Sequence, residues 1–220
     1  MGIISIEQAD HLYWLGRYIE RVYTTLKIFG KRFDDLIDGP TNSYVDFCKS
    51  VDIPNVYMDK DDFVKNYPFD INNPDSIISN LIRAHDNAIT LRESSGSETL
   101  AYIQLAIYEM NKAEKSKSPM IELQKVNDNL LAFYGTVDDQ IDSENIRNII
   151  KAGRRIERID LYARLGLERK EIARQIHRLI PRLEKSGIEY DEAKLMEINR
   201  LIEEDEIDYY KIVFDVETIL

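Results

Sequence analysis

The 220-residue chain contains a single cysteine, and no apolar run approaches the roughly 18–20 residues that a membrane-spanning helix needs. Cys48 by itself cannot form an internal disulfide, which favours a reducing compartment. The first residues, MGIISIEQADHLYW, mix acidic with apolar side chains and include no basic stretch, so they do not resemble a signal peptide. We therefore expect a cytoplasmic protein with no membrane association.

The chain also lacks a surplus of positive charge. It has 29 basic and 40 acidic side chains, which give a net charge of −11. A nucleic-acid-binding surface must neutralise phosphates, so an acidic chain is a poor candidate for that function. The sequence contains no P-loop, G-x-G-x-x-G, H-E-x-x-H or C-x-x-C motif, and no Glu-x-x-His pair for a di-metal site. These absences predict no metal and no cofactor.

Helical periodicity dominates what is present. Apolar residues recur at steps of three and four from Leu12 to Phe33, and Ser5 precedes Gln8 at capping-box spacing. This pattern predicts a helix ending near Ile37. Further helices are expected from Asn73-Pro74 to Ser94, from a second capping box at Ser95 and Glu98, from Ser118-Pro119 to Gly135, and from Ser143 to Leu165 before Gly166. Pro181 is expected to kink or shorten the helix that follows.

Residues 38–75 are the least regular stretch and hold four of the six prolines. Within it, YVDFCKSV and KDDFVKN each match a short helix, and a connection of this length is typical of a functional loop. No segment has the pattern of a β-hairpin. The sequence therefore predicts an all-α fold, an antiparallel helical bundle of about seven to nine helices with an irregular insert near residues 38–75.

One charged motif occurs twice. Residues 16–22 are GRYIERV and residues 153–159 are GRRIERI. The spacing places the two arginines and the glutamate of each copy on one helix face. The helix of the second copy is apolar nearly all round, which predicts that its charged cluster is at least partly buried. The residues are Arg17, Glu20 and Arg21 in the first copy and Arg154, Glu157 and Arg158 in the second.

Buried charges must be paired, and four arginines against two glutamates leave two positive charges over. Asp86, Glu93 or a bound anion can balance them. Because arginine forks favour carboxylate and phosphate, the surplus points to an anionic ligand. A structural ion-pair network is the alternative and the commoner origin of such clusters.

Charge is also uneven along the chain. Residues 151–185 contain eleven basic and five acidic side chains, whereas residues 186–220 contain three basic and eleven acidic ones. Three interpretations stay open: the acidic segment covers the basic one, the basic segment binds an acidic partner, or both are solvated helix faces.

The motifs resemble those of the alpha-E family of bacterial all-helical proteins. Residues 9–21, ADHLYWLGRYIER, are similar to the family's amino-terminal segment, and Gly153, Arg154, Glu157, Arg158 and Asp160 match its later Gly-Arg-x-x-Glu-Arg-x-Asp pattern. Residues 84–93 follow its middle segment, with His85 and Ile89 in place of arginines. The resemblance implies a single helical domain over residues 1–220.

The resemblance also implies partners, an ATP-grasp-type ligase and a transglutaminase-like peptidase. If the three segments pack together, they line one ligand-binding face. We assign to it Arg17, Glu20, Arg21, Arg83, Asp86, Arg92, Glu93, Arg154, Glu157 and Arg158.

Our first hypothesis for the function is an accessory or binding protein of a peptide- or amide-bond-forming system, with an Arg/Glu-lined pocket for an anionic small molecule or peptide. The second is an enzyme of amide or acyl transfer that uses Glu20 or Glu157 as acid–base. The third is a structural scaffold in which the Arg/Glu residues clamp helices together. The sequence assigns no catalytic residue.

Overall fold

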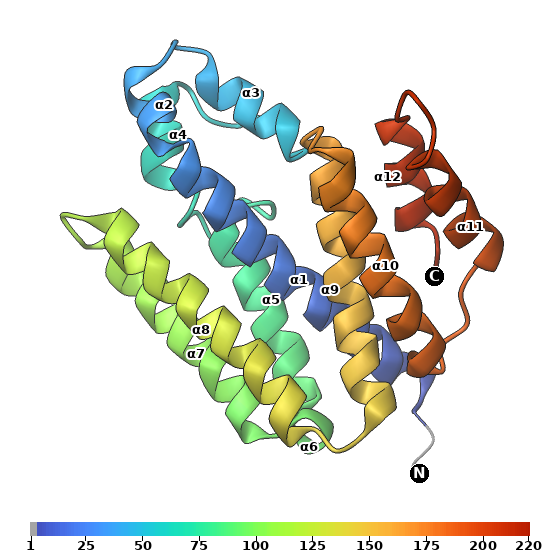
Figure 1. The fold of residues 1–220 in the computed structure, drawn as a ribbon. Helices are drawn as coiled ribbons and strands as arrows, with labels where there is room; N and C mark the ends of the chain where they lie inside the picture. The colour runs from blue at the N-terminus through green and yellow to red at the C-terminus, as the bar shows by residue number, and fades with distance from the viewer. Residues whose placement is uncertain (1–3) are drawn as a thin grey trace.

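The computed structural model describes residues 4–220, and this part of the chain forms twelve helices and no strand (Figure 1). The long helices are α1 (Ile6–Lys31), α5 (Ile77–Thr90), α7 (Ser97–Glu114), α8 (Pro119–Gln140), α9 (Glu144–Arg164) and α10 (Arg169–Ser186). The short ones are α2 (Phe33–Asp38), α3 (Ser43–Ser50), α4 (Lys60–Asn66), α6 (Arg92–Ser95), α11 (Glu192–Leu201) and α12 (Tyr209–Glu217). The predicted all-α class is confirmed. The short helices raise the number of helices to twelve, above the predicted seven to nine.

The long helices alternate in direction along the chain, as expected for an antiparallel bundle (Figure 1). α1 and α9 lie at its centre and pack against each other. α1 also contacts α5 and α8, whereas α9 contacts α10 and α12. Because an even number of reversals separates them, α1 and α9 run in the same direction (Figure 1). Equivalent positions in the two motif copies can therefore meet side by side.

The predicted start of the first helix is confirmed. The Ser5 hydroxyl caps α1 by accepting a hydrogen bond from the Gln8 amide at 3.1 Å. The predicted end near Ile37 is wrong in detail, because α1 ends at Lys31 and the chain turns at Arg32 before α2.

The irregular insert is ordered by aromatic packing. Its two predicted short helices are present as α3 and α4. Phe47 of α3 and Phe63 of α4 pack against Phe29 near the end of α1, and Phe63 stacks on Tyr67 at 4.9 Å between ring centroids. These rings are almost fully buried. The insert thus extends the hydrophobic core rather than forming an open loop.

Two predicted helix starts are wrong because local side chains form other turns. α5 begins at Ile77, since the Ser76 hydroxyl caps the Ser79 amide at 3.1 Å, and Pro74 lies in the preceding turn. The capping box predicted for Ser95 and Glu98 does not form. The Ser95 hydroxyl instead donates to the Leu91 carbonyl, and α7 starts after Gly96 at φ 85°.

Two predicted helix ends are also wrong. α8 passes through Gly135 and continues to Gln140, because one exposed glycine inside a helix costs only about 1 kcal/mol. α10 extends through Pro181 to Ser186, since its buried face packs against α9, so the predicted shortening is wrong. The alternative, a kink at Pro181, stays a prediction. The stop predicted at Gly166 is confirmed by its φ of 59°, a left-handed conformation suited to glycine.

Candidate functional site

The two motif glycines lie where α1 and α9 cross. A Cβ atom on Gly16 would lie 2.1 Å from the Ile150 carbonyl oxygen, and one on Gly153 would lie 2.2 Å from the Tyr13 carbonyl oxygen. Neither distance is compatible with a side chain, so only glycine lets the helices approach this closely. The contacts are reciprocal, because each glycine faces the carbonyl oxygen of the residue three positions before the other glycine. The crossing therefore has a local two-fold relationship within one chain.

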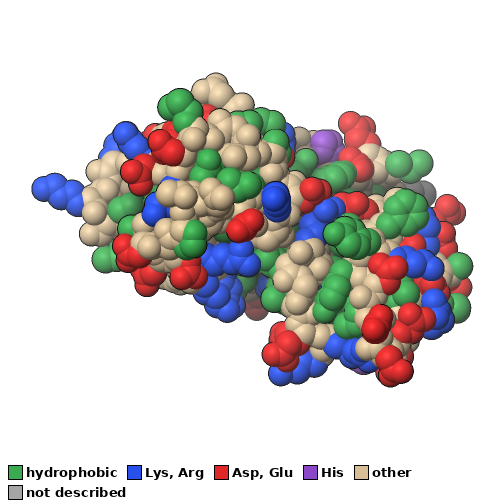
Figure 2. All heavy atoms as spheres, turned by 90° about the horizontal axis from the view of Figure 1, so that it is seen from above, with side chains coloured by type: hydrophobic (Ala, Val, Ile, Leu, Met, Phe, Trp, Pro, Cys, Tyr) green, Lys and Arg blue, Asp and Glu red, His purple; other side chains and the backbone are tan. Residues whose placement is uncertain are grey.

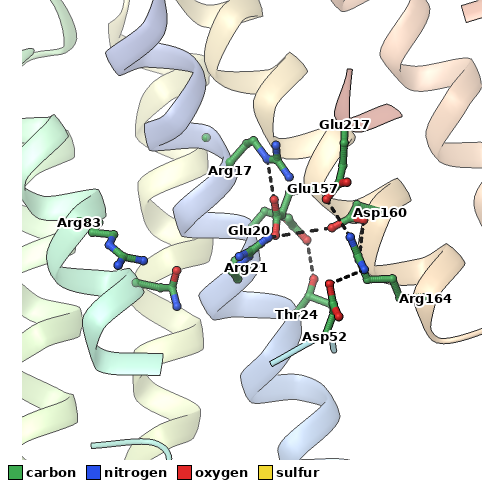
Figure 3. A network of polar contacts seen from close by, with 12 residues as sticks. Arg17, Glu20, Arg21, Thr24, Asp52, Arg83, Glu157, Asp160, Arg164 and Glu217 are labelled. Atoms are coloured by element: carbon green, nitrogen blue, oxygen red, sulfur yellow. Dashed lines mark hydrogen bonds and ion pairs between the residues drawn. The ribbon is translucent and has the colours of Figure 1, made fainter. Parts of the chain in front are cut away.

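The same reciprocity governs the charged residues. Glu157 of α9 is fully buried and accepts hydrogen bonds from two arginines of α1, Arg17 at 2.7 Å and Arg21. Burial alone would raise the pKa of Glu157, but the positive charges of both arginines outweigh burial and lower it. Glu157 is therefore ionised at neutral pH and fully occupied by its two partners (Figure 3).

Glu20 of α1 is the counterpart and is also fully buried. Its carboxylate accepts from Arg154 at 3.0 Å and from Arg158 at 2.5 Å, both on α9. It also accepts from the Thr24 hydroxyl at 2.7 Å. The Arg154 guanidinium lies 3.6 Å from the ring centroid of Tyr134 on α8, which adds a cation–π contact.

We call this set of six residues the Arg/Glu clamp: Arg17, Glu20, Arg21, Arg154, Glu157 and Arg158. Each motif copy supplies two arginines to the glutamate of the other copy. The burial predicted for the second copy extends to the first, since Arg17 is only 6% exposed. The face of α1 that carries Arg17 is polar because it packs against the charged face of α9.

Asp160, one turn after Glu157, breaks the symmetry. Its side chain is buried, and its Oδ1 accepts from Arg164 at 2.7 Å. Its Oδ2 has no hydrogen-bond partner among the described residues and lies 4.0 Å from the Arg21 Nη2. Burial and the nearby charge of Glu157 raise the pKa of Asp160, and Arg164 lowers it only in part, so the resulting pKa is about 6. Arg164 also binds Asp52 and Glu217, so it links α9 to the insert and to α12 (Figure 3).

The other four predicted ligand-binding residues lie outside the clamp. Arg83 lies on α5 and donates to the Pro74 carbonyl at 3.0 Å (Figure 3). Arg92 donates to the Ser97 hydroxyl, and Asp86 and Glu93 are exposed. The sequence allowed Asp86 or Glu93 to balance the positive charge of the clamp, but neither residue does so in the structure. The assignment of all ten residues to a ligand stays a prediction.

The clamp is closely packed. The cavity that borders Arg21 has a volume of about 10 Å³, enough for one water molecule and too small for a substrate. No clamp residue lines the larger cavities described in residues 4–220. These residues also contain no cluster of three His, Cys, Asp or Glu side chains arranged to hold a metal. Burial raises the pKa of the Cys48 thiol to about 11, so the thiolate is scarce at neutral pH.

Unbalanced positive charge lies along α9 and on α10, which packs against it. We call Lys151, Arg154, Arg155, Arg158, Arg178 and Arg182 the α9–α10 basic strip. Lys151 pairs with Asp138 of α8, and Arg155 donates to Gln175 of α10 at 2.8 Å. Within residues 4–220, the only carboxylates paired with the strip are Asp138 and Glu20. Six cations thus meet two anions among the described residues.

Burial and repulsion between neighbouring cations together lower the pKa of two residues of the strip. Burial and the charges of Arg182, Arg154 and Arg155 lower the pKa of Lys151 to about 8. Burial and the charges of Arg154 and Arg158 lower the pKa of Arg155 to about 10. The Arg155 Nε is buried without a partner among the described residues. The sequence showed the excess of basic residues over 151–185 but did not place Lys151 or Arg155 in a site.

The acidic carboxyl-terminal segment does not cover the strip. It packs against the far end of α9, where Arg164 pairs with Glu217, and Arg169 donates to the Glu204 and Asp205 carbonyls. Its other acidic side chains include Glu197, which pairs with Arg200 and Lys211 of the same segment. On the face shown in Figure 2, basic and acidic side chains are interspersed and form no continuous basic surface. This face lacks the extended positive charge that nucleic acids require.

These features define an all-helical bundle whose central helices are joined by two copies of a Gly-Arg-x-Ile-Glu-Arg motif. The chain belongs to the Alpha-E family: residues 7–196 match its model, which is described as a predicted alpha-helical domain with a conserved ER motif. The Glu-Arg pair occurs in both copies, as Glu20-Arg21 and Glu157-Arg158. No curated protein and no solved structure is significantly similar to the chain. No helix within residues 4–220 is long and apolar enough to cross a membrane.

Proposed function

We propose that this protein is an accessory binding module of a peptide- or amide-bond-forming system and that the α9–α10 basic strip holds an anionic group of its ligand or partner. In this proposal the Arg/Glu clamp fixes α1 against α9 and thereby positions the strip. The ATP-grasp-type ligase and the transglutaminase-like peptidase implied by family resemblance are the proposed partners. The anion is a carboxylate or a phosphorylated group, because both match guanidinium geometry.

One observation carries the proposal: the strip retains like charges at a cost to stability. Arg155 is partly buried, its Nε is buried without a partner among the described residues, and burial together with the neighbouring cations lowers its pKa. Folding alone would favour an apolar residue there, because an unpaired buried donor costs about 1–3 kcal/mol. A bound anion beside the strip would relieve the repulsion between its cations. Residues kept against stability are typical of binding sites.

The hypothesis of acid–base catalysis by Glu20 or Glu157 has less support. Both carboxylates are fully buried, and each accepts two guanidinium groups. A general acid needs a proton and access to substrate. The pKa of Glu157 is lowered, and the cavity beside Arg21 has room for only one water molecule. The geometry instead favours the clamp as a structural element, which agrees with the third hypothesis for these six residues.

Calorimetric titration with triglutamate and with pyrophosphate tests the proposal. We expect at least one anion to bind the wild-type protein, with affinity falling as salt rises because the contacts are ionic. Arg155→Met should weaken binding about tenfold, the effect of losing one charged hydrogen bond. Arg174→Met is the matched control, since Arg174 is an exposed arginine of α10 outside the strip and pairs with Glu171.

Two results would contradict the proposal. One is the absence of binding by both anions at millimolar concentration. The other is equal affinity in Arg155→Met and wild type, which would place any bound anion elsewhere. Glu20→Gln and Arg154→Met are less informative, because both disrupt the clamp and therefore the fold.

A further inference from the structure

Two arginines at the contact between α9 and α10 are held by neutral side chains. Arg155 of α9 donates from Nη1 to the Oε1 of Gln175 on α10 at 2.8 Å. Arg182 of α10 donates from Nη1 to the Oδ1 of Asn148 on α9 at 3.1 Å. We call these two contacts the amide pairs. They are reciprocal, because each helix supplies the arginine of one pair and the amide of the other.

Both amides are buried in the packed contact between the helices. Gln175 is 1% exposed and Asn148 is 2% exposed. The Asn148 Nδ2 donates to the Glu144 carbonyl at 2.8 Å, so the Asn148 oxygen is left to accept from Arg182. A side chain that is fixed by packing and by its own hydrogen bond holds its partner in one place. The amide pairs therefore fix the positions of two guanidinium groups.

The amides hold their arginines without neutralising them. An amide oxygen is an uncharged acceptor, whereas the carboxylates of Glu20 and Glu157 neutralise arginines of the clamp. Within residues 4–220, Arg155 and Arg182 bond these amides and pair with no carboxylate. A glutamate at position 175 or an aspartate at position 148 has nearly the same shape and would supply the missing charge. The contact thus keeps two oriented guanidinium groups uncompensated.

Lys151 lies between the amide pairs along α9 and is sensitive to their charge. Burial and the charges of Arg182, Arg154 and Arg155 lower the pKa of Lys151 to about 8. Asp138 of α8, which pairs with Lys151, is exposed. Both arginines of the amide pairs therefore act on one group that lies between them.

The two amide pairs are separated along the helices. Asn148 and Arg155 are seven residues apart on α9, and Gln175 and Arg182 are seven residues apart on α10. Seven residues make about two helical turns, or roughly 10 Å, so both pairs lie on one face at that separation. Pyrophosphate is shorter than this. Side chains three residues apart on an extended peptide are also separated by about 10 Å.

We propose that the amide pairs keep Arg155 and Arg182 as two spaced, uncompensated cations that bind an extended peptide through carboxylates about 10 Å apart. Gln175 and Asn148 are then positioning residues, which act through the arginines and do not contact the peptide. This inference rests on the proposed function of the α9–α10 basic strip and names the class of anion that the strip binds.

Two peptides of identical composition test the spacing. Glu-Ala-Ala-Glu and Ala-Glu-Glu-Ala, both N-acetylated and C-amidated, carry two carboxylates that are three residues apart in the first and adjacent in the second. We expect the first to bind about tenfold more tightly in calorimetric titration at low salt, because only it meets both guanidinium groups. Equal affinities, or no binding of either peptide at millimolar concentration, would overturn the extended ligand.

Nearly isosteric variants test the amides. Gln175→Glu and Asn148→Asp each place a carboxylate beside an arginine, so each should weaken binding of Glu-Ala-Ala-Glu at least about tenfold while the protein stays folded. Gln104→Glu is the matched control, because Gln104 is exposed on α7 and the variant adds the same charge. Unchanged affinity in both amide variants, or an equal loss in Gln104→Glu, would contradict the positioning role.

The pKa of Lys151 separates this inference from the proposed function, because NMR titration of the Lys151 side chain needs no bound anion. We expect a pKa of about 8 in the wild type and a higher pKa in both amide variants. The rise should be larger in Asn148→Asp, since Arg182 lowers the pKa of Lys151 more than the other neighbouring charges do.

The two readouts fail independently. An unchanged pKa of Lys151 in both amide variants would overturn the role of the amides even if the strip binds anions. A raised pKa in a protein that binds neither triglutamate, pyrophosphate nor either peptide would confirm that the amides leave the arginines uncompensated. That second result would overturn the proposed function and, with it, the peptide as ligand.

Discussion

Gly16 and Gly153 occupy equivalent positions at the crossing of α1 and α9, and each faces a carbonyl oxygen of the other helix. We expect Gly16→Ala or Gly153→Ala to lower the free energy of unfolding by about 3 kcal/mol or more, because the backbone must move to admit a methyl group. Chemical denaturation monitored by circular dichroism measures the change.

Gly135→Ala is the matched control for the glycine variants. A Cβ atom there meets nothing within 4 Å, and the residue lies inside α8. The free energy of unfolding should rise by about 0.5–1 kcal/mol, since alanine is the better helix former. Comparable losses at all three glycines would contradict close approach at the crossing.

The clamp should be far more sensitive to partial than to complete removal. Glu157→Met leaves Arg17 and Arg21 without their carboxylate, and we expect a loss of about 3–5 kcal/mol. Adding Arg17→Met and Arg21→Met to Glu157→Met should recover part of that loss, because no buried charge is then unpaired. Urea denaturation of the single and triple variants compares them.

If the triple variant were less stable than Glu157→Met, the arginines would contribute independently of the carboxylate. The mirrored set, Glu20→Met with and without Arg154→Met and Arg158→Met, should behave in the same way. The extra hydrogen bond from Thr24 should make the Glu20 set somewhat more costly.

Arg155→Met should stabilise the protein although it weakens anion binding. Burial and neighbouring cations lower the pKa of Arg155 to about 10, so its positive charge opposes folding. We expect a gain of about 1 kcal/mol after solvent screening is allowed for. Thermal unfolding at low and high salt measures the gain, which should shrink as salt screens the repulsion.

Arg174→Met is the control for that gain, because Arg174 is exposed on α10 and pairs with Glu171. Its effect should stay within about 0.5 kcal/mol. A loss of stability in Arg155→Met would show that Arg155 has a structural role and would remove the main support for the basic strip.

Asp160 should make stability depend on pH between about 4 and 6. Its folded pKa of about 6 lies above the ordinary value of 3.8, so the folded state binds the proton more tightly than the unfolded state does. The contribution of Asp160 is therefore most favourable below pH 4 and is lost as pH rises through 6. The loss is at most about 3 kcal/mol by linkage.

Asp160→Asn cannot ionise, so it isolates this effect. The free energy of unfolding of wild type minus that of Asp160→Asn should decrease as pH rises from 4 to 7. Guanidinium denaturation across this range checks it. A difference that is constant, or that increases with pH, would mean that Arg164 holds the Asp160 carboxylate ionised more strongly than burial opposes it.

The sequence by itself determined the fold class and the central motif. Steps of three and four between apolar residues indicate helices whatever their neighbours, so the bundle and α9 could be predicted closely. Pro74 misled the prediction of a helix start, and Gly135 and Pro181 misled the prediction of helix ends. Local propensity is worth only a few kcal/mol, and packing outweighs it. The repeated Gly-Arg-x-Ile-Glu-Arg motif was visible, and so was its charge imbalance.

Only the tertiary structure decided how that imbalance is arranged. Periodicity places Arg17 and Glu20 on one face of a helix but does not say which helix covers it. Because α1 and α9 run in the same direction, the copies exchange partners, and Glu20 and Glu157 become fully buried. Arg83, Asp86, Arg92 and Glu93 stay apart, since pairing depends on distances between helices rather than spacing along the chain. For the same reason, packing alone left the Arg155 Nε without a partner among the described residues.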